Sequence, residues 1–309
     1  MGVRSISLLV LAGTIMAPPL WGDNEVDLSG YRVGTLNDDA VRESSGLACP
    51  RDANGFFWTH NDGGNGAWLY RLDREGTVIE QLEVNGSENV DWEDLALLQR
   101  GTQSRLVIAD IGDNFGRRDD VQLLITDASD VSRSGSVDVI QTISFSYPDG
   151  PRDSEAIAVD DEAATVWIVA KRTIPAELYI LDLASLPEGE TVTAEFVGTL
   201  NSLPQPSRQD IALAPIKQDW FWQPTALDFS PDGRLAAVLT YEAIYLYERQ
   251  AGESWQQAFE AAPSRFALGE GWAAEALCLT SEAVFWTTEG KQPPLFRIPL
   301  SDPAWAAPN

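Results

Sequence analysis

The segment Asp91–Asn114 reads DWEDLALLQRGTQSRLVIADIGDN and holds two short apolar runs separated by a polar link. Carboxylates stand at the start of the first run, at Glu93 and Asp94, and at the end of the second run, at Asp110. Two such runs joined by a short turn predict a β-hairpin. This hairpin would bring both acidic groups to one edge, where we expect the chemistry of the protein to lie.

The pattern around this hairpin recurs along the chain. Each copy begins with a polar or acidic lead-in and continues with short apolar strands separated by turns, the third strand being rich in aromatic residues. The first apolar anchors of the copies stand at positions 47, 95, 157, 227 and 277. The intervals between anchors suit units of four strands, the longer intervals carrying insertions. A series of such units predicts a β-propeller.

The start of the chain supplies the closure of the ring. Tyr31–Leu36 closely matches Glu195–Leu200, which ends the third copy, whereas the last copy finishes its third strand near Leu300 with little chain left. An N-terminal strand would therefore complete the last blade. We predict an all-β fold, a single β-propeller of five four-stranded blades closed by an N-terminal strand. The inserted stretch Asn201–Phe221 leaves room for a sixth blade.

Length and composition indicate one exported domain. The 309 residues, 44% of them hydrophobic, can supply one large core. Residues 1–22 carry one arginine and then the apolar run Ile6–Ala17, which is shorter than a membrane span and typical of a secretory signal. We assign 1–22 as a signal peptide, with an uncleaved anchor as the alternative, and 23–309 as the propeller domain. The expected location is the periplasm or the exterior of the cell.

The charge restricts the possible partners. The formal net charge of −26 argues against binding nucleic acid or anionic lipid, because both need basic patches. An acidic surface with few lysines is typical of a protein exposed to high salt. We expect a monomer that takes a small-molecule or carbohydrate ligand and has no membrane span once the signal is removed.

The two cysteines, Cys49 and Cys278, both fall inside apolar strands. A bridge is allowed in an exported protein. The repeat register places them on opposite faces of their strands, which favours two buried thiols.

The repeats also gather polar residues. In a propeller the first strand of each blade lines the central axis, and its start lies on the same face as the end of the second strand. The positions two before the anchors are Ser45, Glu93, Glu155, Thr225 and Glu275. The second strands end near His60, Asp110, Lys171, Thr240 and Thr288. Pairing the hairpins places each residue of the first set opposite one of the second to within about one residue, so separate blades send polar groups toward one axial pocket.

Carboxylates gathered in this way repel each other. Two of them about 5 Å apart cost roughly 3 kcal/mol at an effective dielectric constant of about 20. Protonation, the nearby Lys171 and Arg172, or a bound cation can compensate. One histidine and two dispersed cysteines supply a zinc or copper site poorly, whereas oxygen ligands from Asp, Glu and Asn suit calcium. The alternative for Asp110–Asn114 is a turn whose side chains cap backbone amides.

Tryptophans offer a second kind of contact. Trp222 and Trp272 share one repeat position, five before the anchor, and Trp92 lies nearby in its own blade. On the axial face they would stack on a sugar or another flat ligand. The alternative is a wedge between blades, which we expect for the tryptophans inside second strands, Trp58, Trp167 and Trp286.

Five motifs together resemble a group of exported bacterial propeller proteins of undefined activity. They are Glu43–Leu47, Trp58–Gly64, Asp91–Asp94, Asp110–Asn114 and Asp153–Ala156. More loosely, they are similar to esterase-like phytase and gluconolactonase-type propellers, which are calcium-dependent hydrolases of phosphate esters or lactones with acidic residues near the axis. The resemblance implies metal ligands at the matching positions, Glu93, Asp94, Asp110, Asp113, Asn114 and Glu155. A phytate site should carry more Lys and Arg than these loops do.

These observations predict a calcium-binding propeller that hydrolyses an ester, a phosphoester or a lactone. His60 or Glu275 would move protons. The predicted substrate contacts are Lys171, Arg172, Trp92, Trp222 and Trp272. A non-catalytic module that binds a carbohydrate or a protein is the alternative, and a glycoside hydrolase using paired carboxylates such as Glu155 and Glu275 is a third possibility.

Overall fold

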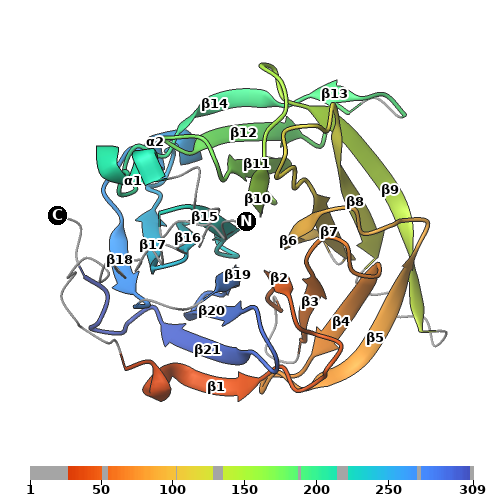
Figure 1. Ribbon diagram of the computed structural model, residues 1–309, viewed down its shortest axis with the longest axis horizontal. Coiled ribbons are helices and arrows are strands. Elements are labelled where there is room, and N and C mark those ends of the chain that lie inside the picture. The colour runs from red at the N-terminus through yellow and green to blue at the C-terminus, as the bar shows by residue number, and fades with distance from the viewer. Residues whose placement is uncertain are drawn as a thin grey trace, which may run out of the picture.

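The computed structural model describes residues 27–50, 55–101, 103–127, 135–186, 189–213, 222–269 and 273–306. The predicted signal peptide, Trp272 and the last part of the insertion, 214–221, lie outside these ranges. The strands of the described residues form four-stranded antiparallel blades arranged in a ring around a central axis (Figure 1). The predicted β-propeller is therefore confirmed.

Five blades follow one another along the chain. The first contains β2 (Ser44–Ala48), β3 (Phe57–Asn61), β4 (Trp68–Leu72) and β5 (Val78–Asn85). The second contains β6 (Trp92–Arg100), β7 (Gln103–Asp110), β8 (Val121–Asp127) and β9 (Ser136–Ser146). The third contains β10 (Ser154–Asp160), β11 (Thr165–Ala170), β12 (Glu177–Asp182) and β14 (Glu195–Thr199). The fourth contains β15 (Pro224–Phe229), β16 (Leu235–Thr240), β17 (Ala243–Glu248) and β18 (Ser264–Ala267).

The fifth blade is closed by the start of the chain, as predicted. It contains β19 (Ala274–Leu279), β20 (Ala283–Thr288), β21 (Pro294–Pro299) and then β1 (Arg32–Thr35), which follows the short helix η1 (Ser29–Tyr31). Strand β1 runs antiparallel to β21, with Thr35 opposite Pro294. The ring is thus held together by hydrogen bonds between the two ends of the chain.

The insertion before the fourth blade adds no sixth blade in its described part. Residues 201–213 contain the helix α1 (Arg208–Leu213) and no strand. A second helix, α2 (Trp255–Ala258), lies between β17 and β18. The outer strands β5 and β9 pair in parallel and join the first two blades, and the short β13 (Val192–Thr193) pairs with β9.

The core consists of five apolar clusters, each lying between two neighbouring blades. Every blade is covered on both faces by its neighbours, so its first strand is buried on both sides; β10, for example, has no exposed residue. Trp58, Trp167 and Trp286 pack in these clusters, as predicted for tryptophans of second strands. This packing explains why the first strands read as nearly continuous apolar runs.

Cys49 and Cys278 form a disulfide, with their Cα atoms 5.4 Å apart, so the prediction of two buried thiols was wrong. The two residues do lie on opposite faces of their strands, but they belong to neighbouring blades, the first and the fifth. Neighbouring blades of a ring face each other with opposite sides of their sheets. Opposite faces are therefore the condition for contact here, and the bridge supports the closure made by β1.

Two features bear on where the protein resides. A disulfide is compatible with an exported protein, because oxidising compartments allow such bridges to persist. In the part of the chain that the structure describes, no helix has the length and apolar character needed to cross a membrane.

Candidate functional site: an acidic well at the axis

A β-bulge occurs at the same place in every blade. The register between the first and second strands shifts two positions before the anchor, so that one residue of the first strand has no direct partner on the second. The bulged residues are the predicted set, Ser45, Glu93, Glu155, Thr225 and Glu275. A bulge bends its strand and re-aims the side chain of the extra residue. The observed hairpin registers lie within one or two residues of the predicted ones.

The two neutral bulge residues bond to the next blade. The Ser45 hydroxyl donates to the carbonyl oxygen of Glu93 at 2.6 Å, and the Thr225 hydroxyl donates to that of Ala274 at 2.8 Å. These bonds hold neighbouring first strands together around the axis. The three acidic bulge residues are therefore the ones left to form a polar site.

Two groups of three carboxylates meet at the axis and share one member. Asp62, Asp91 and Glu93 form the first group, and Glu93, Asp153 and Glu155 form the second. Within each group, one oxygen of every carboxylate lies within 4.8 Å of the others. Asp62 follows β3, Asp91 precedes β6 and Asp153 precedes β10, so three blades contribute to one cluster. We call the five carboxylates, with Glu275, the axial well.

The three carboxyl groups of the first group have raised pKa values. Burial, together with the neighbouring carboxylates, raises the pKa of Asp62 to about 7 and that of Asp91 to about 6. Burial raises the pKa of Glu93 well above its usual value, and Glu155 adds to the effect by its charge and by a hydrogen bond between the two side chains. Burial is the largest cause for all three groups, and the neighbouring negative charges add to it.

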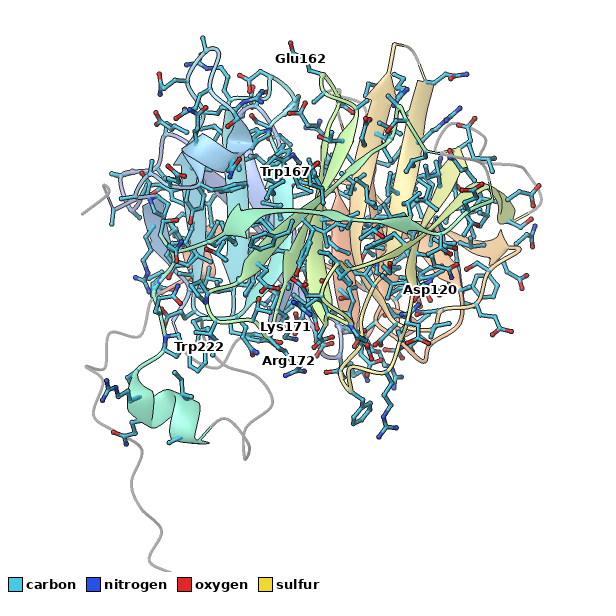
Figure 2. The ribbon with its side chains drawn as sticks, turned by 90° about the horizontal axis from the view of Figure 1, so that it is seen from above. Asp120, Glu162, Trp167, Lys171, Arg172 and Trp222 are labelled. Carbon is cyan, nitrogen blue, oxygen red and sulfur yellow. A yellow bond between two sulfur atoms is a disulfide. The ribbon has the colours of Figure 1, made fainter. Side chains whose placement is uncertain are left out.

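The second group carries its own positive charge. The Lys171 ammonium lies 3.0 Å from Oε1 of Glu155, and the guanidinium of Arg172 pairs with Asp153. Burial alone would lower the pKa of Lys171, but the carboxylates of Glu155 and Glu275 raise it above its usual value. Lys171 and Arg172 point toward one face of the ring, whereas Glu162 lies at the opposite face (Figure 2).

Glu275 completes the well from the fifth blade. Its Oε1 accepts a hydrogen bond of 2.7 Å from the Tyr241 hydroxyl, whereas its Oε2 is buried without a hydrogen-bond partner. Only 8% of the residue is exposed. Burial raises the pKa of Glu275 well above its usual value, although Lys171 opposes the effect. The Glu275 side chain therefore holds a proton more readily than an exposed glutamate does.

Two glycines let the backbone approach the carboxylates of the first group. A Cβ atom on Gly63 would lie 2.1 Å from Oδ1 of Asp91, and one on Gly112 would lie 2.0 Å from Oε1 of Glu93. Any side chain at these positions would collide with the acidic groups. Gly63 and Gly112 therefore form a tight wall that confines Asp91 and Glu93 to the cluster.

Asp94, one of the predicted metal ligands, bonds to the backbone of two strands and is not one of the clustered carboxylates. Its two oxygens accept hydrogen bonds of 2.8 Å each, from the backbone N–H of Leu95 and from that of Ile157 in the next blade. Asp228 makes the same link between the fourth and fifth blades. The Asp94 carboxylate thus joins two first strands.

Replacing Asp94 by Ala should destabilise the protein by about 2–5 kcal/mol, because two buried N–H groups lose their acceptor. Chemical denaturation measures this loss. Asp94→Asn retains one acceptor oxygen and should lose less. A variant that keeps full stability but no longer binds a metal ion would show that Asp94 is a ligand after all.

Asp110 is engaged by neighbours on its own hairpin. It pairs with Arg118 at 2.8 Å, accepts a hydrogen bond of 2.9 Å from the Gln122 amide, and accepts one of 3.2 Å from the backbone N–H of Asp91. Asp110 thus helps to position the backbone of Asp91, and its carboxylate is not one of the five that converge.

Asp113 and Asn114 form the turn that the sequence offered as the alternative. The two carboxylate oxygens of Asp113 accept from the backbone N–H groups of Arg117 and Arg118, and the Asn114 side chain accepts from Arg172. Of the six predicted metal ligands, only Glu93 and Glu155 therefore lie in the converging cluster.

His60 is placed inside the core. The imidazole is 0% exposed, lies edge-on to the ring of Trp92 at 5.5 Å between centroids, and contacts the backbone of Gly46 so closely that a Cβ there would lie 2.5 Å from Nε2. Burial lowers its pKa, so the ring is neutral. Its Nδ1 lies 3.0 Å from the carbonyl oxygen of Asn61, and its Nε2 is buried without a hydrogen-bond partner, so a role of His60 in proton transfer stays a prediction.

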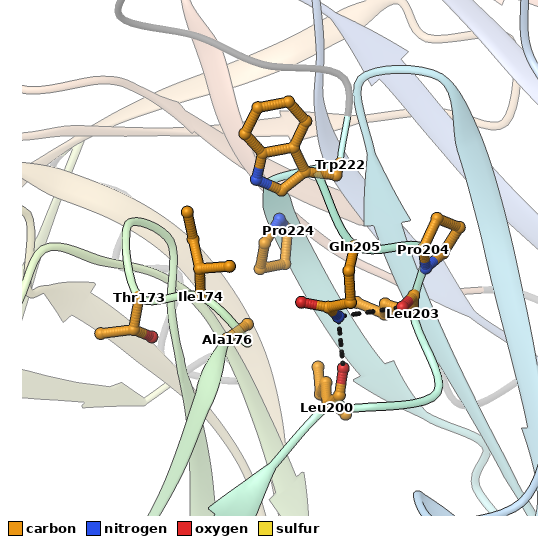
Figure 3. A pocket seen from close by; sticks show the side chains of 9 residues that line it. All are labelled: Thr173, Ile174, Ala176, Leu200, Leu203, Pro204, Gln205, Trp222 and Pro224. Atoms are coloured by element: carbon orange, nitrogen blue, oxygen red, sulfur yellow. Dashed lines mark hydrogen bonds between the residues drawn. The ribbon is translucent and has the colours of Figure 1, made fainter. Parts of the chain in front are cut away.

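The predicted aromatic contacts are placed in three different ways. Trp92 is 0% exposed in the cluster between the first two blades and presents no face to a ligand. Trp222 lies over a narrow cleft with Ile174, Leu203 and Gln205 (Figure 3), whose volume of about 10 Å³ suits a single water molecule. Trp272 lies outside the described residues.

Sequence reasoning missed Asp62, Asp91 and Asp153 as members of the cluster. Asp91 and Asp153 both stand four positions before their anchors, so a comparison of this repeat position would have found them. Asp62 follows the end of a second strand by one residue. Tyr241 carried no signal in the sequence, because its partnership with Glu275 joins two blades.

Comparisons with known proteins add little to this description. No protein-family model matches the chain, and no curated protein matches its sequence. The PQQ-bound aldose sugar dehydrogenase from Streptomyces coelicolor aligns in structure with a TM-score of 0.45 and 11% identity, over 86% of this chain and 95% of that one. A chain of the nidogen/laminin complex aligns with a TM-score of 0.44 and 10% identity, over 80% of this chain and 73% of that one. The resemblance to phytase and gluconolactonase-type propellers stays a prediction.

Proposed function

We propose that the axial well binds one calcium ion through Asp62, Asp91 and Glu93. The convergence of three carboxylates from two blades carries the proposal, because in the described chain no lysine or arginine forms an ion pair with any of them. A divalent cation would replace the protons that these groups otherwise retain. Asp62 and Asp91 are partly exposed, so an ion can enter from solvent.

The donor set favours calcium over transition metals. All three side chains offer oxygen, and calcium takes six to eight oxygen ligands in a flexible geometry. The wall formed by Gly63 and Gly112 fixes Asp91 and Glu93 but adds no side chain that would block an ion. Both cysteines are bridged and the only histidine is fully buried in the core, so the softer ligands of the chain are not among the converging groups.

We further propose that the protein hydrolyses an ester, a phosphoester or a lactone at this site. A bound calcium ion polarises a carbonyl or phosphoryl oxygen. Glu275 would hold a proton for the leaving group, since burial raises its pKa and Oε2 makes no hydrogen bond. Tyr241 would keep the Glu275 side chain in place. Export of the chain, with removal of residues 1–22, belongs to the same proposal and is checked by the mass of the mature protein.

Activity and chelation test the hydrolase against the alternative module. In the presence of calcium, the purified protein should turn over chromogenic esters, phosphoesters or lactones. A chelator should remove about 90% or more of that rate. Glu275→Gln should lose turnover while it still binds calcium. Binding of a glycan or protein that the chelator does not affect, with no turnover of any substrate, would favour the non-catalytic module. Absence of calcium binding by calorimetry would refute the site itself.

A further inference from the structure

The axial well has two groups of carboxylates, and the proposed calcium ion occupies only the first of them. The second group, Glu93, Asp153 and Glu155, has the same closeness of oxygens as the first. We infer that the Lys171 ammonium occupies the second cation position of the well, so that the protein holds one divalent ion and would hold two without this ammonium. The inference rests on the proposed calcium site.

Lys171 is built into the well. Its residue follows the end of β11, and the side chain is 6% exposed. Its Nζ lies 3.0 Å from Oε1 of Glu155 and 5.4 Å from the centre of the Tyr241 ring. The aromatic face and the carboxylate hold the ammonium from different blades. A surface lysine samples many positions, but this side chain is confined to one.

Acidic groups surround this ammonium on more than one side. Glu155 and Glu275 both interact with Lys171, and Glu93 bonds to Glu155. Glu275 has a buried oxygen, Oε2, that no hydrogen bond engages. Lys171 therefore pairs with Glu155 and interacts with Glu275, and one carboxylate oxygen of Glu275 is left without a hydrogen bond. A divalent ion in this part of the well would use this unengaged buried oxygen as a ligand.

The arrangement explains why one ion should bind and not two. Glu93 belongs to both groups, so two divalent ions would share its carboxylate and lie close together. The fixed ammonium supplies positive charge at the second position with half the charge of a divalent ion. The first position is left as the one without a basic partner. Lys171 is thus a residue that determines how many ions the well takes.

Counting bound calcium ions tests the inference. Equilibrium dialysis at pH 7.5 and constant ionic strength should find one ion per wild-type chain and two per Lys171→Met chain, since Met keeps the length of the side chain without its charge. Lys171→Arg should bind one ion. Lys291→Met is the matched control, because it makes the same change at a lysine whose side chain is 70% exposed and lies outside the axial well, and it should also bind one ion.

Each other outcome is decisive. One ion in Lys171→Met, two ions in the wild type, or two ions in Lys291→Met would overturn the inference. Zero ions in the wild type and one in Lys171→Met would refute the proposed calcium site but support the role of Lys171. Zero ions in both proteins would overturn both statements.

The unfolding temperature of Lys171→Met provides a second test of the inference. Without calcium, Lys171→Met leaves buried carboxylates without compensation, so its unfolding temperature should fall below that of the wild type. Calcium should raise that temperature more for the variant than for the wild type, because two ions bind in place of one. If neither Lys171→Met nor Lys171→Gln folds in calcium, the second cation position does not exist and the inference fails.

Discussion

Glu93→Gln should lower the affinity for calcium by more than about 100-fold, because even residues that only support a metal ligand are worth up to about that much. Glu93 belongs to both carboxylate groups, is 3% exposed and lies in the bulge of β6. No other described residue can replace it as a shared member. Calcium titration by calorimetry measures the loss.

The same substitution should not weaken the fold in the absence of calcium. It removes a buried acidic group from among Asp62, Asp91 and Glu155, so repulsion within the metal-free well decreases. Glu162→Gln is the matched control, because it makes the same chemical change at an exposed residue on the opposite face (Figure 2). Equal loss of affinity in both variants, or a metal-free Glu93→Gln protein that unfolds, would show that Glu93 acts through general charge or structure.

Calcium affinity should fall by about 1,000-fold between pH 8 and pH 5. Protons and calcium compete for the same oxygens, and the pKa values of Asp62 and Asp91 are about 7 and about 6. Below both values each pH unit costs roughly tenfold per proton displaced, or roughly 100-fold for the pair. The raised pKa of Glu93 acts in the same direction. Titrations at constant ionic strength from pH 5 to pH 8 measure the slope.

The free energy of unfolding of the metal-free protein should fall as pH rises, whereas the affinity for calcium rises with pH. A carboxyl group with a raised pKa makes the folded state bind more protons than the unfolded state, so stability falls as pH rises. For Asp62 and Asp91 the loss falls between about pH 4 and pH 7, the interval between their ordinary and raised pKa values. Calcium should remove this loss. A double variant, Asp62→Asn with Asp91→Asn, should flatten both profiles, and an unchanged wild-type-like slope would contradict the assignment.

The repeat pattern was sufficient to predict the ring. The anchors at 47, 95, 157, 227 and 277 are found in five first strands, and the match between Tyr31–Leu36 and Glu195–Leu200 identified two outer strands, β1 and β14. This worked because apolar periodicity and turn residues act locally and recur in each blade. The same register predicted that Glu93, Glu155 and Glu275 lie at the axis.

The sequence could not predict which hydrogen-bond and ion-pair partners each acidic residue of the well would have. Asp110, Asp113 and Asn114 are residue types that commonly bind metal ions. In the structure, however, Asp110 pairs with Arg118, Asp113 accepts hydrogen bonds from backbone N–H groups, and Asn114 accepts one from Arg172. Nothing in a linear pattern shows which oxygen is already bonded. His60 illustrates the same limit, because only the packing of Gly46 and Trp92 around it shows that the ring is buried.

The sequence by itself determined the four-stranded repeat, the closure by the N-terminal strand and the end of the ring at which acidic groups meet. Periodic burial and turn chemistry encode these features within each repeat. Only the tertiary structure decided which carboxylates converge, that Lys171 stands among them, and that Cys49 meets Cys278. These contacts all join different blades, where distance depends on how the ring closes and on how neighbouring sheets face each other.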